Sequence, residues 1–243
     1  MARIPTMEIL GCRVHRLSAP EVQEAVMGLL EAGGSHLVVT ADSSALVIAQ
    51  EDVEFRGIVN TASLVIPDSF GVVLASKMLG NPLPGRCPGV ELAEWLCRYG
   101  AETGRTAYFF GAAVGVAQEA AIRLEARFPG LRVAGTRHGF FKPEEEAQIV
   151  AEIRAARPDF LMVALGIPKQ EKFIARHLEE MGVPICVGVG GSLDCFSGRV
   201  KRAPKLFQRL NLEWLYRLCS NPKKLSKVML LPQFLWLVLR SRR

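Results

Sequence analysis

The chain has 243 residues, 49% hydrophobic and 22% charged, a composition that excludes a disordered or low-complexity protein and supports one substantial core. The net charge of +6 is uneven: residues 199–243 hold twelve Lys or Arg against one Glu (+11), whereas residues 1–198 hold 18 basic and 23 acidic residues (−5). A basic end on an acidic core indicates an anionic partner surface, either nucleic acid or phospholipid.

Cysteine usage and the first residues of the chain indicate a reducing compartment. The six cysteines contain no C-x-x-C pair, and the opening MARIPTMEIL lacks the basic-then-apolar pattern of a signal peptide. We therefore expect a cytoplasmic protein whose cysteines are mostly small core residues.

The first part of the chain alternates apolar runs with helical patterns. Residues 8–17 predict a small hairpin around Gly11, and Ser18-Ala19-Pro20-Glu21 predicts a capped helix that runs to about Ala32. The next elements are expected in this order: a buried strand at 36–40, helices at 44–50 and 53–61, and a strand at 64–66.

The stretch from residue 63 to 91 carries the main candidate site. Its apolar strand ends at Pro67, and Asp68 follows at the point where ligands bind in open α/β sheets. A loop rich in Gly and Pro then carries Arg86. We identify Asp68 as a candidate base and Arg86 as a candidate cationic group. The alternative is that Asp68 only caps the helix that follows, where Asp is common.

The rest of the core predicts a regular alternation of strand and helix. Strands are expected at 107–110, 131–134, 160–165 and 184–189, and helices at 115–128, 143–156 and 169–181. This alternation indicates an α/β fold with a Rossmann-like parallel sheet and right-handed crossovers, here expected in two lobes. No complete G-x-G-x-x-G fingerprint appears, which argues against a dehydrogenase.

A second candidate site follows the strand at 160–165. There Lys169 and Gln170 lie at the start of a helix, where backbone N–H groups favour diphosphate oxygens or a uracil amide. The alternative is an ordinary turn with solvated polar residues.

The sequence predicts a site without a metal ion. Asp52 and Glu54 have the spacing of a metal–nucleotide clamp, but residues two apart do not share a helix face. The four histidines form no cluster with ligand-like spacing.

We expect two parts in the chain, a core at 1–198 and a helical, basic appendage at 199–243 that associates with a membrane. The apolar run at 228–239 is too short for a bilayer, which needs about 20 residues. With Trp236 and basic flanks, it is typical of a segment that lies in the membrane interface.

Several motifs together resemble those of the WecG/TagA/CpsF glycosyltransferases, in the family's order and over nearly the whole chain. They are Thr40-Ala41-Asp42, Pro67-Asp68-Ser69-Phe70-Gly71-Val72, Arg86-Cys87-Pro88-Gly89-Val90-Glu91, Gly166-Ile167-Pro168-Lys169-Gln170-Glu171, and Gly198-Arg199-Val200-Lys201-Arg202-Ala203-Pro204 followed by Glu213-Trp214-Leu215-Tyr216-Arg217.

The resemblance implies an inverting, metal-independent glycosyltransferase with no cofactor. Its donor would be a UDP-sugar, typically N-acetylmannosamine or its uronic acid, and its acceptor a sugar on undecaprenyl diphosphate. Asp68 would be the general base, and Arg86 would lie at the reacting centre. The other positions follow the family pattern: Thr40 and Asp42 near the sugar, Gln170 at the nucleotide, and Arg217, Lys224 and Lys227 at the diphosphates.

The sequence departs from the family at three positions, with Asp42 in place of Asn, Ser69 in place of Gly and Glu91 in place of Asp. An ionised Asp42 beside the sugar would repel a uronic acid. The departure at position 42 therefore predicts a neutral donor such as UDP-N-acetylmannosamine. The three departures also leave a different hexose open.

The rival hypothesis is a non-catalytic nucleotide- or nucleic-acid-binding protein that uses the same fold and the basic tail. Because the tail joins its charges to a continuous apolar run, lipid is favoured over nucleic acid as its partner. We expect the enzyme on the inner face of the cell membrane, with the oligomeric state, a homo-oligomer included, left open.

Overall fold

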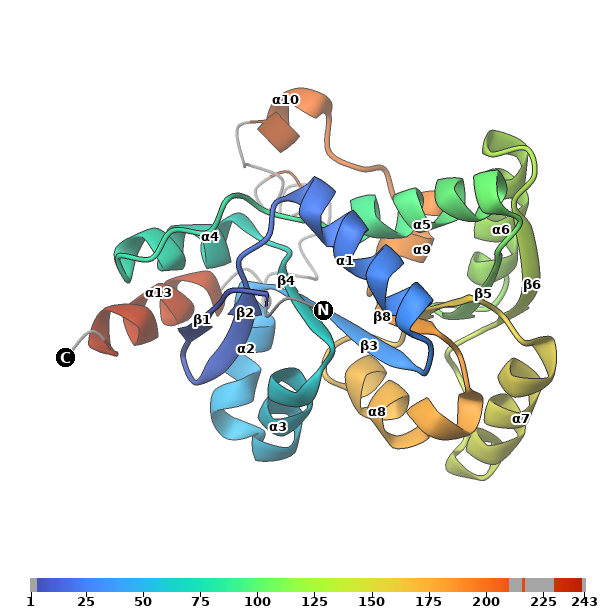
Figure 1. Cartoon of the computed structure of the whole chain (residues 1–243), viewed down its shortest axis with the longest axis horizontal. Helices are drawn as coiled ribbons and strands as arrows, with labels where there is room; N and C mark the ends of the chain where they lie inside the picture. Colours follow the sequence, from blue (N-terminus) through green and yellow to red (C-terminus); the bar gives the residue numbers. More distant parts are fainter. Residues whose placement is uncertain (1–3, 210–215, 217–229, 242–243) are drawn as a thin grey trace.

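The computed structural model describes residues 4–209, Tyr216 and residues 230–241, and its centre is one six-stranded parallel sheet (Figure 1). The strand order is β4-β3-β8-β7-β5-β6. The strands are β3 (His36–Ala41), β4 (Leu64–Pro67), β5 (Thr106–Gly111), β6 (Arg132–Arg137), β7 (Phe160–Ala164) and β8 (Ile185–Gly188). The predicted α/β class and parallel sheet are confirmed.

The two expected lobes share this single sheet. Strand β3 pairs in parallel with β8, from His36 opposite Ile185 to Val38 opposite Val187. This pairing joins the first two strands of the sheet to the four that come later in the chain. The separation into lobes inferred from the sequence is therefore replaced by one continuous layer.

A two-stranded antiparallel hairpin precedes the sheet, as the sequence predicts. It consists of β1 (Thr6–Ile9) and β2 (Cys12–His15). The N–H of Val65 in β4 donates to Nδ1 of His15 at 2.9 Å, so the hairpin is bonded directly to the strand that leads to Asp68.

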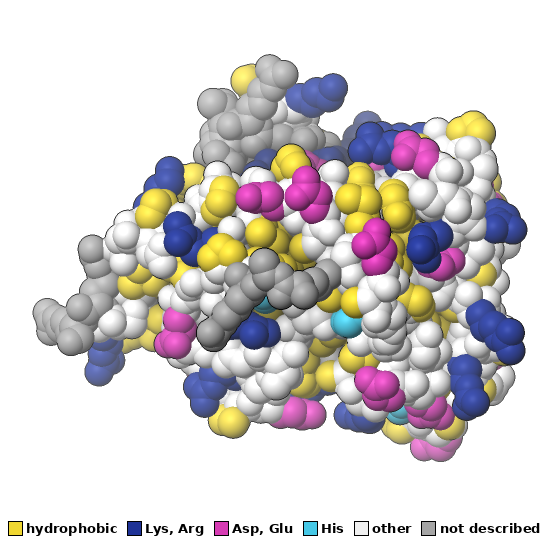
Figure 2. Space-filling model, viewed as in Figure 1, with side chains coloured by type: hydrophobic (Ala, Val, Ile, Leu, Met, Phe, Trp, Pro, Cys, Tyr) yellow, Lys and Arg dark blue, Asp and Glu magenta, His cyan; other side chains and the backbone are white. Residues whose placement is uncertain are grey.

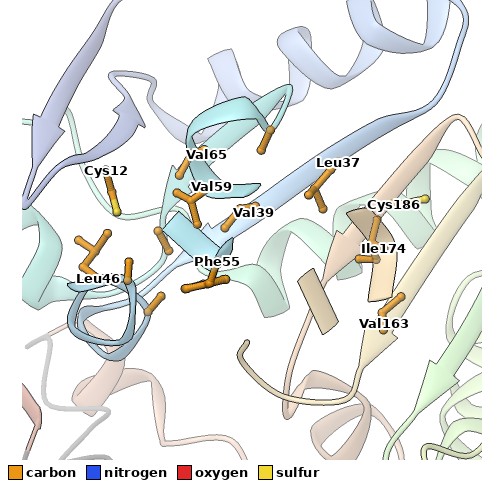
Figure 3. Packing of buried hydrophobic residues seen from close by; sticks show 14 of the residues in the cluster. Cys12, Leu37, Val39, Leu46, Phe55, Val59, Val65, Val163, Ile174 and Cys186 are labelled. Carbon is orange, nitrogen blue, oxygen red and sulfur yellow. The ribbon is translucent and has the colours of Figure 1, made fainter. Parts of the chain in front are cut away.

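Helices cover both faces of the sheet because its strands are apolar on both sides. One face packs against α1 (Ala19–Ala32), α5 (Gly89–Thr103), α6 (Val116–Arg127) and α9 (Ser192–Phe196). The other packs against α2 (Ser43–Glu51), α3 (Val53–Thr61), α7 (Glu146–Ala156), α8 (Lys169–Met181) and α13 (Leu230–Arg240). Alternate residues of β3 point to opposite faces, with Val38 in the first cluster and Leu37 and Val39 in the second. Figure 3 shows Leu37 and Val39 within the second cluster.

Helix α4 (Phe70–Met78) packs on this second face as well, with Val72 and Ala75 fully buried in its cluster. The 3-10 turn η1 (Pro143–Glu145) and α10 (Lys205–Arg209) complete the described structure.

The last described helix belongs partly to the core. Helix α13 packs against α2 and lies beside α4 at one end of the molecule (Figure 1). Phe234 and Val238 are fully buried there, whereas Trp236 and Leu239 are 55% and 53% exposed. The apolar run predicted to lie in a membrane interface therefore has one face in the protein core, and only the opposite face is open to a partner.

The surface of the core shows no large block of one charge on the face drawn in Figure 2, where basic and acidic side chains are interspersed. Among the described residues, no helix combines the length and the apolar character needed to cross a bilayer.

Candidate active site

Asp68 lies at the carboxyl end of β4 and is fixed by two neighbouring elements. Its own N–H donates to the carbonyl of Ala41 at 2.9 Å, which extends the pairing of β4 with β3. Its Oδ1 accepts a hydrogen bond from the N–H of Gly89, the first residue of α5. The N-cap of the following helix α4 is Ser69 and not Asp68. The capping alternative for that helix is therefore wrong, and the carboxylate instead faces the start of α5.

Arg86 lies in the loop that folds over this end of β4. The N–H of Cys87 donates to the carbonyl of Pro67 at 2.6 Å, one residue before Asp68. Together with the bond between Gly89 and Asp68, this contact holds residues 86–89 against the strand end. The structure therefore brings the candidate base and the candidate cationic residue to the same corner of the sheet.

Cys87, beside Arg86, does not provide a reactive thiolate. Burial raises the pKa of its thiol to about 11, and the nearby carboxylates of Glu91 and Asp68 act in the same direction. The thiol therefore stays protonated at neutral pH, and a thiolate nucleophile is not available at this position.

Thr40 pairs with Ile66, two residues before Asp68, and both Thr40 and Asp68 contact Gly89 at the start of α5. Oγ1 of Thr40 donates to the carbonyl of Gly188 at the end of β8, at 2.8 Å. A Cβ at Gly89 would be 3.0 Å from Cγ2 of Thr40, so the start of α5 packs closely on this side chain. Thr40 thus connects three elements around the site, and it is buried.

Asp42, expected near the sugar, is the N-cap of α2. Its Oδ1 accepts from the N–H of Ala45 at 2.7 Å and from the hydroxyl of Ser44 at 2.6 Å. A carboxylate at a helix N-terminus is stabilised by the helix dipole and by these donors. The Asp42 carboxylate thus lies at the start of α2, two residues after Thr40. Its effect on the sugar stays a prediction.

Gln170 is almost completely buried, with 1% of its surface exposed. Its Oε1 accepts from the N–H groups of Gly166 at 3.2 Å and Gly190 at 3.1 Å, and its Nε2 donates to Glu171 at 2.8 Å. Gln170 therefore joins the loop after β7 to the loop after β8. These bonds give the side chain a structural role that the sequence did not reveal. The expected contact of Gln170 with a nucleotide stays a prediction.

Gly188 lies between Thr40 and Gln170 and contacts both of them. A Cβ on Gly188 would be 2.5 Å from Nε2 of Gln170, so the backbone and the amide approach more closely than a side chain allows. Lys169, in contrast, is exposed at the first position of α8. Of the two neighbours, only Lys169 is placed to meet a ligand from solvent.

The segment that begins the appendage is pinned to the core by two ion pairs. Arg199 contacts Glu119 of α6 at 2.6 Å, and Arg202 contacts Glu91 of α5. Both pairs are partly exposed and add little stability. They join residues 199 and 202 to α6 and α5, so the start of the appendage lies against the core. The other basic candidates, Arg217, Lys224 and Lys227, lie outside the described residues.

Sequence reasoning missed two parts of this site. Gly89 supplies the N–H that fixes Asp68, and Ser43 supplies a hydroxyl 3.3 Å from that of Ser69. A glycine at the start of a helix was the only local signal for the first. Within the residues that the structure describes, no group of three or more His, Cys, Asp or Glu side chains is arranged to hold a metal ion.

The sequence matches the family described as "Glycosyl transferase WecG/TagA/CpsF family" over residues 7–243. It is similar to two proteins that are both named N-acetylglucosaminyldiphosphoundecaprenol N-acetyl-beta-D-mannosaminyltransferase. The protein from Bacillus spizizenii (strain W23) is 36% identical over 206 residues, which cover 85% of this chain and 79% of that protein. The protein from Staphylococcus aureus (strain MW2) is 33% identical over 206 residues, which cover 85% and 80%.

Proposed function

Since this chain belongs to the WecG/TagA/CpsF family of glycosyl transferases, we propose that it transfers N-acetylmannosamine from a UDP-linked donor to an amino sugar on undecaprenyl diphosphate. The names of the two relatives supply the transferred sugar and the lipid-linked acceptor. The product would serve the synthesis of a cell-surface polysaccharide or teichoic acid. The observation that carries the proposal is the carboxylate of Asp68 at the carboxyl end of the sheet, between β3 and the start of α5.

Asp68 is the general base in this proposal. Its carboxylate takes the proton from the acceptor hydroxyl while that oxygen attacks the anomeric carbon of the donor, and the bond from this carbon to UDP breaks with inversion. General base catalysis contributes about 10²–10⁴-fold to a rate. The bond from Gly89 orients the carboxylate, since one of its oxygens is held in place before substrate binds.

The departing UDP needs positive charge, which basic side chains provide in place of a metal ion. Arg86 lies at the corner that holds Asp68, and the exposed Lys169 stands at the N-terminus of α8, where the helix dipole also favours an anion. Arg217, Lys224 and Lys227 of the appendage would complete this set at the diphosphates of donor and acceptor. Fixed charges directed at a developing anion stabilise the transition state.

We also propose peripheral attachment to the inner face of the cell membrane. The acceptor is a membrane lipid, and residues 199–243 carry a charge balance of +11. Helix α13 supports this, because Trp236 and Leu239 stay exposed while the opposite face of the helix is buried. An amphipathic helix with a Trp and basic neighbours is typical of the membrane interface.

Substitution of the base tests the reaction. Asp68→Asn keeps the size of the side chain but cannot accept the proton, so we expect turnover to fall by about 10²–10⁴-fold with UDP binding unchanged. Transfer from UDP-N-acetylmannosamine to a short-chain lipid-diphosphate acceptor measures turnover, and calorimetric titration measures UDP affinity. Glu51→Gln, the same chemical change at an exposed position of α2, serves as the control.

Three results would contradict parts of the proposal. A rate near that of the wild type in Asp68→Asn would remove this residue as the base. Loss of wild-type turnover in a chelator, with recovery in magnesium, would contradict the metal-independent mechanism. Equal or better turnover of the uronic acid donor would contradict the preference for a neutral sugar that we attribute to Asp42.

A further inference from the structure

The first turn of α13 reaches the turn of chain that carries Asp68. A Cβ at Gly71 would be 2.8 Å from Cδ1 of Leu231 in α13 and 2.2 Å from Oγ of Ser43 in α2. Both side chains therefore reach the space that a side chain at position 71 would fill. The contact joins the C-terminal helix to a residue only three positions after Asp68.

The start of α4 depends on contacts from other elements, because the side chain of its N-cap residue does not bond to the helix. The side chain of Ser69 makes no hydrogen bond to its own helix. Its hydroxyl instead lies 3.3 Å from both the N–H and the Oγ of Ser43. A helix start without a side-chain cap loses a stabilising bond, so contacts from α2 and α13 gain importance for its position.

Leu231 is partly buried and packs against the core on the buried side of α13. Phe234 and Val238 follow it at three and seven positions, a spacing that places all three on one side of a helix. Both are fully buried among residues of the core. The packing of α13 against α2 and α4 therefore fixes where Leu231 meets Gly71.

We infer that Leu231 is a positioning residue for the proposed base. It packs against Gly71 and, with the hydroxyl contact between Ser69 and Ser43, holds the turn of residues 68–71 in the geometry that directs the Asp68 carboxylate at the acceptor. The inference rests on the proposed function for the reaction that Asp68 performs. It assigns the C-terminal helix a role through packing that is separate from any attraction of its charges to lipid.

Substitutions in α13 test this role. Leu231→Ala removes the methyl groups next to Gly71, and Leu231→Met keeps most of the volume of the side chain. Ile122→Ala makes a similar truncation at an exposed position of α6 and serves as the control. A water-soluble acceptor with a short lipid chain removes membrane binding from the assay. We expect Leu231→Ala to lower kcat by about 10- to 100-fold, because small misplacements of a catalytic group have effects of this size. UDP affinity stays unchanged, Leu231→Met recovers most of kcat, and Ile122→Ala matches the wild type.

Hydrogen exchange separates this inference from the reaction itself. The N–H of Asp68 is bonded to Ala41 and that of Val73 to Ser69, so their exchange reports the order of the turn. We expect faster exchange in residues 68–73 for Leu231→Ala and no change for Ile122→Ala. Wild-type exchange and wild-type kcat in Leu231→Ala would overturn the inference. If the wild type transfers no sugar, the proposed function fails, and exchange alone then decides whether Leu231 holds the turn.

Discussion

Asp68 and Gly89 are 21 residues apart, yet a hydrogen bond between them holds one oxygen of the candidate base. The same holds for Thr40 and Gly188, which are 148 residues apart and meet through one hydrogen bond. At the level of single residues, the site consists of polar groups that satisfy one another across separate loops. Changes to these groups therefore have different effects, depending on whether the group faces the protein or the ligand.

Gln170 and Lys169 allow this distinction to be measured on neighbouring residues. Gln170→Leu leaves the N–H groups of Gly166 and Gly190 without their acceptor, so we expect the free energy of unfolding to fall by about 1–3 kcal/mol. Lys169→Ala changes an exposed side chain and leaves this free energy unchanged, but it raises the KM for the UDP donor if Lys169 contacts the diphosphate. Urea unfolding and donor titration measure the two effects. A wild-type stability of Gln170→Leu would contradict the structural role of this side chain.

His15 makes the stability depend on pH. Burial, followed by the charge of Arg13, lowers the pKa of its imidazole, and Nδ1 is occupied by the bond from Val65. The unfolded chain therefore binds a proton at a higher pH than the folded one. The contribution of neutral His15 to the free energy of unfolding is fully present above the ordinary pKa of about 6.5. It is lost on acidification towards the lowered pKa of the folded protein, by at most about 1.4 kcal/mol per pH unit.

The variant His15→Asn isolates this effect, since its amide oxygen keeps an acceptor near the N–H of Val65 but does not titrate. Unfolding in urea at several pH values between about 7 and about 5 gives the slope. We expect a smaller loss of stability in the variant than in the wild type. An identical slope in both proteins would show that other groups cause the acid sensitivity.

At the level of elements, α13 has a buried face and an exposed face, which the sequence presented as one apolar run. Phe234 contributes to the core with α2 and α4, so Phe234→Ala should lower the free energy of unfolding by about 3–5 kcal/mol. Trp236→Ala, at an exposed position of the same helix, should change it little. Thermal and urea unfolding of the two variants check this difference. Equal effects would mean that α13 does not pack on the core in solution.

The boundary predicted at residue 199 separates an acidic part of the chain from a basic part. It does not separate two independently packed parts, because residues after it contact the core. Residues 199–203 are pinned to α5 and α6 by ion pairs, and α13 returns to the opposite side of the sheet. Removal of the appendage would therefore expose apolar core residues of α2 and α4 in addition to deleting basic groups. Single substitutions separate these effects better than a truncation does.

For the whole molecule, the separation of charge predicts how the protein finds its acceptor. The +11 balance of residues 199–243 should draw it to vesicles with anionic lipid, and the exposed face of α13 should hold it there. We expect co-flotation with anionic vesicles that weakens as salt rises, and little binding to neutral vesicles. An oligonucleotide shift assay runs in parallel. Tighter binding to the oligonucleotide than to anionic vesicles would support the rival nucleic-acid hypothesis.

The sequence by itself determined the α/β class, most helices and strands, and the positions of the strand ends that carry Thr40 and Asp68. Periodicity, turn residues and caps are local properties, so a single sequence reports them. Only the tertiary structure decided that one sheet joins both halves, that Asp68 faces Gly89, that Gln170 ties two loops together, and that Leu231 reaches Gly71. These contacts join residues far apart in the chain, and they arise from the packing of whole helices on the sheet, which no local pattern encodes.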